Sequence, residues 1–335
     1  MVANVLCRRY IFLVRLLKVL IMAKYPISLL TNNVLDAFQK ADKTSVEVLN
    51  AAIANNEISS EIDYDNIDDV IKAPKAKNAK KEIYLQQTYL SHLWAFTYSI
   101  FVIYEEGVQK RMLDNSFSGE VNFNNKLLKD AELLFNWSVS LRDNFSHWPD
   151  DLPRPDSADS YKLDTYTAKS NRIFQNSVAY LLYHEFAHLK LGHSSFIKGL
   201  ANCNELDKVA ERKNIENEAD QYALAMLITP EMDDKEKVIL GASILLMMVS
   251  CLFIIKEPYN IQQTYHPDLE TRILNVIQGI NFDDKGRECY IWYMACFGFV
   301  MFFRENNIQF TIEEEAEDSK ELFFMYLSEM DKWKI

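Results

Sequence analysis

The sequence predicts a mainly α-helical protein, of the α+β kind with at most a small sheet. The chain has 335 residues and is 49% hydrophobic, which is enough to bury a large core. It contains only 8 glycines and 8 prolines, few for the many tight turns of a β-sandwich or a β-barrel. Apolar residues also recur at helical spacing over long stretches, above all over residues 82–112.

Residues 1–25 form the first predicted segment, an N-terminal extension or helix. The apolar run 5–23 is interrupted by four basic residues, so it holds no uncharged stretch long enough to cross a bilayer. Three interpretations stay open. The segment is a helix of the fold, an upstream extension with Met22 rather than Met1 as the start, or, with less weight, a basic amphipathic helix on a membrane surface.

Residues 26–147 are predicted to form a helical N-terminal region, with helices over 27–54, 82–112 and 122–144. Between the first two, the chain is acidic and then basic. We interpret these adjacent blocks of opposite charge as a solvated loop or linker. His92 lies among aromatic residues and is expected to be a core residue rather than a metal ligand.

Residues 148–155, Trp-Pro-Asp-Asp-Leu-Pro-Arg-Pro, break all regularity. We place the domain boundary here, so that residues 148–335 form the catalytic region with its C-terminal helices. A helix is predicted from residue 167 to residue 191, and Gly192 is well placed to end it.

This helix carries the motif on which the function depends, Tyr-His-Glu-Phe-Ala-His over residues 183–188. A spacing of four residues places His184 and His188 on one helical face, where both imidazoles can bind one zinc ion. Glu185 lies about 100° round the helix and can take a proton from a zinc-bound water. The pattern is HExxH, the signature of zinc metallopeptidases.

A catalytic zinc needs a third protein ligand. The extended pattern HExxHxxGxxH fails here, because Leu191 and Ser194 stand where glycine and histidine are required. His193 follows the expected helix end, so we treat it as a bystander to the metal rather than a ligand.

The third ligand is predicted downstream, on a helix that includes residues 214–226. Glu216 and Asp220 are four residues apart and share one face of it. Glu216 can give a carboxylate oxygen to zinc, and Asp220 can accept the far ring N–H of a ligating histidine and so fix its tautomer. Glu218 points about 200° away from Glu216 and ranks well below it as a ligand.

HExxH followed by ExxxD on a second helix resembles the glutamate-zincin (gluzincin) peptidases, which implies a zincin-like core. The form ExEADxxA is similar to the ImmA/IrrE-type peptidases, although that group usually has asparagine at the position of Asp220. HExxHxxxGH and the segment 265–273 resemble the HtpX and CAAX-prenyl peptidase pattern. Length, the helical N-terminal half and aromatic content most resemble the phage-exclusion Lit peptidase family.

These resemblances imply further roles. His266 is expected to stabilise the oxyanion, and Arg272 to hold a carboxylate of the site in place; the alternative is a helix-entry turn with Arg272 on its surface. In zincins a short sheet edge pairs with the peptide substrate, and any such strand is expected within or just before residues 148–155. The Lit resemblance implies phage exclusion by cleavage of a host translation factor, elongation factor Tu.

Two apolar runs raise the question of a membrane. Residues 238–255 and 289–303 are at or below the length of a bilayer span, and we interpret both as core helices. The net charge of −12 argues against a nucleic-acid partner. The five cysteines form no CxxC pair, which favours a reducing, cytoplasmic location.

The sequence therefore predicts a zinc endopeptidase that acts on a protein substrate. Three alternatives stay open: a regulatory protease that cleaves a repressor, a zincin fold kept as a non-catalytic interaction module, and a membrane-embedded peptidase. The oligomeric state stays open as well.

Overall fold

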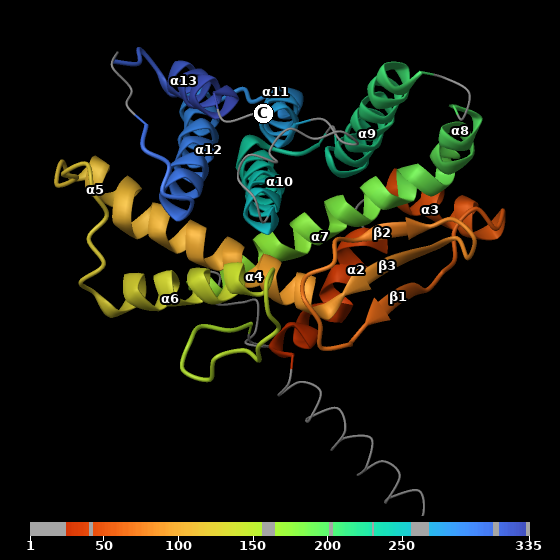
Figure 1. The fold of residues 1–335 in the computed structure, drawn as a ribbon, viewed down its shortest axis with the longest axis horizontal. Coiled ribbons are helices and arrows are strands. Elements are labelled where there is room, and N and C mark those ends of the chain that lie inside the picture. Colours follow the sequence, from red (N-terminus) through yellow and green to blue (C-terminus); the bar gives the residue numbers. More distant parts are fainter. Residues whose placement is uncertain are drawn as a thin grey trace, which may run out of the picture.

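The computed structural model describes residues 25–39, 43–155, 165–200, 204–229, 231–255, 268–310 and 315–332. The predicted segment 1–25, apart from Tyr25, and the predicted oxyanion residue His266 lie outside these ranges. The described chain is mainly α-helical with one small sheet, as predicted (Figure 1).

The long helix α7 (Tyr166–Lys190) is the centre of the fold and crosses most of the molecule in Figure 1. It begins where the Thr165 side chain accepts a hydrogen bond from the backbone N–H of Ala168. It ends just before Gly192, whose φ of +69° only glycine adopts without strain. The predicted helix 167–191 is therefore confirmed.

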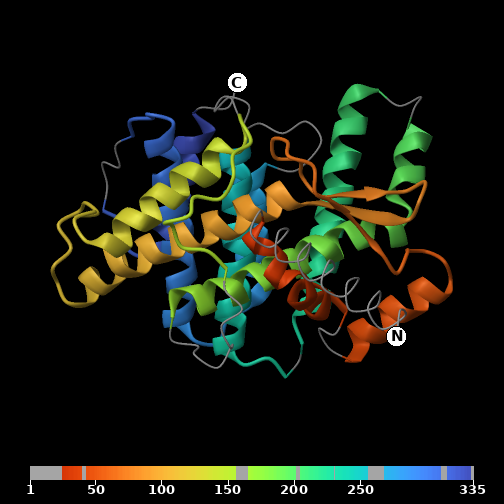
Figure 2. The ribbon, with the colours of Figure 1, turned by 90° about the horizontal axis from the view of Figure 1, so that it is seen from below.

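The other helices form layers around α7. One layer pairs α6 with the continuous helical run of α4, η2 and α5, and Figure 2 shows α4 and α6 side by side. On the other side of α7 lie α9 and α10, with α11, α12 and α13 beyond them. These elements are η1 (Pro26–Leu30), α2 (Thr31–Gln39), α3 (Lys43–Ala54), α4 (Gln87–Val102), the π-helix η2 (Ile103–Gln109), α5 (Lys110–Leu113), α6 (Lys126–Ser140), α8 (His193–Gly199), α9 (Glu205–Leu227), α10 (Asp234–Ile254), α11 (Leu269–Ile280), α12 (Lys285–Glu305) and α13 (Ser319–Asp331).

Both apolar runs lie inside the protein, as predicted. α10 packs against α4, α7, α11 and α12, and Gly298 of α12 allows close approach, because a Cβ there would lie 2.9 Å from Val249 Cγ1. By length and composition α10 is also the one helix of the described ranges that could span a membrane, yet 72% of its apolar window is buried.

His92 is a core residue, as expected: its Nδ1–H donates to the Ser138 carbonyl, and burial lowers its pKa to about 4.

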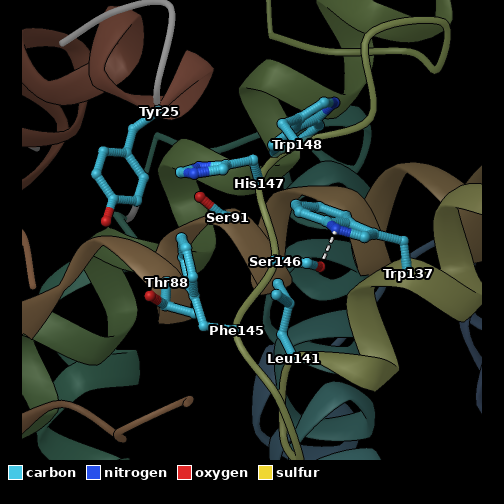
Figure 3. Close-up of a pocket in the computed structure, with 9 residues that line it drawn as sticks. All are labelled: Tyr25, Thr88, Ser91, Trp137, Leu141, Phe145, Ser146, His147 and Trp148. Atoms are coloured by element: carbon cyan, nitrogen blue, oxygen red, sulfur yellow. Dashed lines mark hydrogen bonds between the residues drawn. The ribbon is translucent and has the colours of Figure 1, made fainter. Parts of the chain in front are cut away.

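The proposed domain boundary falls at an aromatic junction. Trp148 packs on Trp94 and Trp137, with ring centroids 5.6 and 4.7 Å apart. Figure 3 shows the residues around a void of ≈ 10 Å³ at this junction, room for about one water molecule. Helices before and after residue 148 share one hydrophobic core. The division into residues 26–147 and 148–335 stays a prediction.

The sheet lies elsewhere than expected. Its strands are β1 (Ile62–Asp65), β2 (Lys75–Lys77) and β3 (Glu82–Gln86), in the order β1-β3-β2, with β1 parallel and β2 antiparallel to β3. The linker interpretation of the charged blocks was wrong, and so was the expectation of a strand near residues 148–155, where the structure has turn and coil. The two blocks flank β3, where Lys77 pairs with Asp63 beside the ring of Tyr84.

Candidate metal centre

Packing of α9 against α7 brings two histidines and a glutamate together. The Nε2 atoms of His184 and His188 lie 3.1 Å apart. A carboxylate oxygen of Glu216 lies 3.2 Å from the first of these nitrogens, and the other oxygen lies 3.5 Å from the second. Among the described residues, these three form the group able to hold a metal ion.

The spacing of these atoms fits a zinc ion. With bonds of 2.0–2.1 Å, two ligand atoms of a tetrahedral zinc lie about 3.3 Å apart. The distance between the two nitrogens, and the distance from each nitrogen to one of the two Glu216 oxygens, are close to that value. The chemistry of the donors agrees. The Nδ1 atom of His184 lies 2.9 Å from Asp220 Oδ1 and donates to it, so the Nε2 atom of the neutral ring carries a bare lone pair. Acceptor atoms so close together need either a proton or a metal cation between them.

Asp220 is fixed from three sides. Arg272 donates to both of its oxygens at 2.6 Å, and the Tyr180 hydroxyl donates to Oδ1 at 2.9 Å. Burial alone would raise the pKa of the Asp220 carboxyl, but the charge of Arg272 and the hydrogen bond from His184 hold it well below its usual value. Asp220 is therefore a permanent anion that orients the ring of His184.

Arg272 is on α11, and its side chain is only 13% exposed, so it does not lie on the surface as in the alternative interpretation. Its guanidinium binds Asp220 in the two-pronged geometry that arginine forms with carboxylates, and it also lines the smaller of the two cavities beside His184. The structure thus brings together five of the predicted site residues (His184, Glu185, His188, Glu216 and Asp220) with Arg272 behind them. The seventh predicted site residue, His266, lies outside the described residues.

Glu185 faces open space beside these residues. Together with His184 it lines two adjoining cavities, of ≈ 250 and ≈ 470 Å³. The smaller one is mostly apolar, with Leu181, Met247 and Ile254 in its wall. The larger one is more polar, and residues of β2 and α8 line it. A substrate in either cavity would meet the Glu185 carboxylate.

Sequence reasoning misses the place of His193. The reversal at Gly192 turns the chain back, so that His193 begins α8 and is only 4% exposed. Its Nδ1 atom lies 2.9 Å from Nδ1 of His188, and its Nε2 atom lies 3.2 Å from Glu218 Oε2. His193 lies outside the group of His184, His188 and Glu216, but it contacts His188, so it is not the bystander that we expected. A histidine directly after a helix-ending glycine was the signal that could have found it.

Comparisons with known proteins point to a peptidase. The sequence profile of the family described as Peptidase U49 matches residues 83–295, which is more than half of the chain and includes all seven predicted site residues. A protein of Escherichia coli (strain K12) named cell death peptidase is 25% identical over 247 residues, which covers 72% of this chain and 76% of that protein. No solved structure matches.

The ligand choice can be tested by comparing two glutamates of α9. Glu216→Ala removes a carboxylate that faces both imidazoles, whereas the Glu218 side chain is 60% exposed and faces only His193. We expect Glu216→Ala to weaken zinc binding by more than the roughly 10- to 100-fold typical of an outer-shell change, and Glu218→Ala by less. Chelator competition measures both; equal effects would contradict the assignment of Glu216.

Metal binding should release a proton. Burial lowers the pKa of His184, but the hydrogen bonds to Asp220 and Glu216 outweigh it and raise that pKa to about 10. Without metal, His184 is thus protonated at pH 7, and a metal must displace this proton. Zinc affinity should rise by about tenfold per pH unit between pH 6 and 8. Calorimetry in buffers of different ionisation enthalpy counts the protons; a value near zero would contradict ligation by His184.

Asp220→Asn tests two roles of Asp220, the orientation of His184 for metal binding and the stabilisation of the fold through Arg272. It leaves the buried guanidinium of Arg272 unpaired, so we expect a loss of about 3–5 kcal/mol of unfolding free energy and zinc affinity lower by about 10- to 100-fold. In the double variant Asp220→Asn with Arg272→Met, stability should recover while zinc affinity stays low. Full recovery of zinc affinity in the double variant would show that Asp220 matters only as the partner of Arg272.

Proposed function

This chain belongs to the Peptidase U49 family and is a protease, and from that premise we propose that it is a zinc-dependent endopeptidase with its centre at His184, His188 and Glu216. The observation that carries the proposal is the set of three acceptor groups at tetrahedral spacing. The full set of donors also argues against a zincin fold kept only as an interaction module.

The proposed reaction is hydrolysis of a peptide bond by water. Zinc in this site would supply Lewis-acid chemistry, polarising the scissile carbonyl and acidifying water. Glu185, between the two histidines and open to both cavities, accepts the proton of the attacking water and delivers it to the leaving amine. Asp220 and Arg272 keep His184 in place throughout.

His266 remains the proposed oxyanion donor. It precedes Asp268, the N-cap residue of α11, by two positions, and α11 carries Arg272. This short distance along the chain from a residue that reaches the site supports the proposal.

The substrate is proposed to lie along β2. This strand pairs with β3 on one side, and its other side has no strand partner among the described residues. β2 packs near α7, and Pro74, just before it, borders both cavities. An extended peptide added to this edge would pass over Glu185, with alternate side chains pointing into the cavities. An extended protein segment is therefore the proposed substrate.

The biological role is proposed by resemblance. The Escherichia coli relative is named a cell death peptidase, a name that fits cleavage of an essential cell protein better than cleavage of a repressor. A cytoplasmic host translation factor, such as elongation factor Tu in phage exclusion, is accordingly the proposed target. Repressor cleavage of ImmA/IrrE type is the alternative.

Glu185→Gln tests the proposal. The amide cannot accept the proton of water, so cleavage should fall by at least about 10²-fold, while the metal-facing groups stay unchanged. Elemental analysis should give about one zinc per chain in the wild type and the variant. Cleavage is measured by mass spectrometry of elongation factor Tu and of cell lysate after incubation.

Glu205→Gln is the matched control, because Glu205 is an exposed glutamate in the first turn of α9 that forms an ion pair with Lys208. It should leave both zinc content and cleavage at the wild-type level. A wild-type protein that cleaves its substrate without bound metal would overturn the proposal.

A further inference from the structure

His193 and Glu218 form a second line of contacts behind the proposed metal ligands. The ring of His193 stands against that of His188, with centroids 5.0 Å apart and planes at 78°. The ring nitrogens that face each other are the two Nδ1 atoms, 2.9 Å apart, while His188 turns its Nε2 atom to His184 and Glu216. His193 thus touches the side of His188 that faces away from the metal.

The direction of these hydrogen bonds follows from the acceptor at the end. An ionised carboxylate only accepts, so Nε2 of His193, at 3.2 Å from Glu218, carries the hydrogen. In the neutral ring the Nδ1 atom of His193 then has a lone pair, and it accepts the Nδ1–H of His188. The Nε2 atom of His188 is left with its lone pair free for a metal.

We propose that His193 and Glu218 are positioning residues that fix the tautomer and ring orientation of His188 for metal binding. This inference rests on the proposed function, since it takes His188 to be a ligand. Under this inference each histidine of HExxH donates its Nδ1–H to an acceptor. His184 donates to Asp220, and His188 donates to His193, which in turn donates to Glu218.

The two lines differ in strength. The Asp220 side chain is nine-tenths buried and forms an ion pair with Arg272, so its position relative to His184 is fixed by contacts among α7, α9 and α11. Glu218 is 60% exposed, and water screens its charge. His193 is buried, so we assign most of the orientation of His188 to the Nδ1 atom of His193 and less to the carboxylate of Glu218.

The test compares two substitutions of one residue. His193→Leu fills the space but removes the acceptor, whereas His193→Asn places a side-chain oxygen about where Nδ1 lies and can still accept from His188. We expect the zinc dissociation constant to rise about 10- to 100-fold in His193→Leu. His193→Asn should recover most of that loss, and Glu218→Ala should lose less than His193→Leu.

The measurements are chelator competition on the full-length chain, with circular dichroism to confirm folding of each variant. Nitrogen NMR of histidine-labelled, zinc-loaded protein should report a hydrogen on Nδ1 of His188, exchanging faster in His193→Leu. A folded His193→Leu variant with wild-type affinity overturns the inference, and so does an asparagine variant as weak as the leucine variant. If the wild type itself binds no zinc, the proposed function fails instead.

Discussion

Asp220 is a carboxylate held almost out of water, and three helices meet on it: α7 through Tyr180 and His184, its own α9, and α11 through Arg272. A buried charge of this kind is stable only with full compensation, and the two-pronged bond from Arg272 gives it. Oδ1 of Asp220 accepts hydrogen bonds from both Arg272 and His184. The position of α11, which carries Arg272, therefore helps to fix the ring of His184. The fold and the metal centre therefore share one ionic contact.

What could be predicted from the sequence was local in the chain. Helical spacing alone places His184 with His188, and Glu216 with Asp220, because residues four apart share a face whatever surrounds them. The end of α7 could be predicted from Gly192, whereas its N-cap, Thr165, was found only in the structure. The meeting of α7 with α9 is not local, and only the chemistry of a third ligand suggested it. The contact of Arg272 with Asp220, 52 residues apart, rested on resemblance.

The sheet could not be predicted, for physical reasons that its residues make plain. β2 is the tripeptide Lys-Ala-Lys, so the strand has the composition of a solvated linker. β3 runs directly into α4, and its buried residues continue the apolar pattern without a break; a short buried strand and a buried helical turn look alike in sequence. The place of His193 could not be predicted for a similar reason. The left-handed conformation of Gly192 turns the chain back, so His193 lies beside His188 rather than farther along the axis of α7.

In the proposed substrate arrangement, the edge of β2 would hold the peptide and Glu185 of α7 would act on it; β2 and α7 are in contact. A strand edge binds any extended backbone, so it gives affinity with little selectivity. A proton acceptor such as Glu185 acts on whatever bond is held beside it. Selectivity must then come from the two cavities, one mostly apolar and one more polar, and from the requirement that the substrate segment be extended and accessible. In a folded target few segments satisfy this, so under the proposed arrangement the protein would cleave few bonds of such a target.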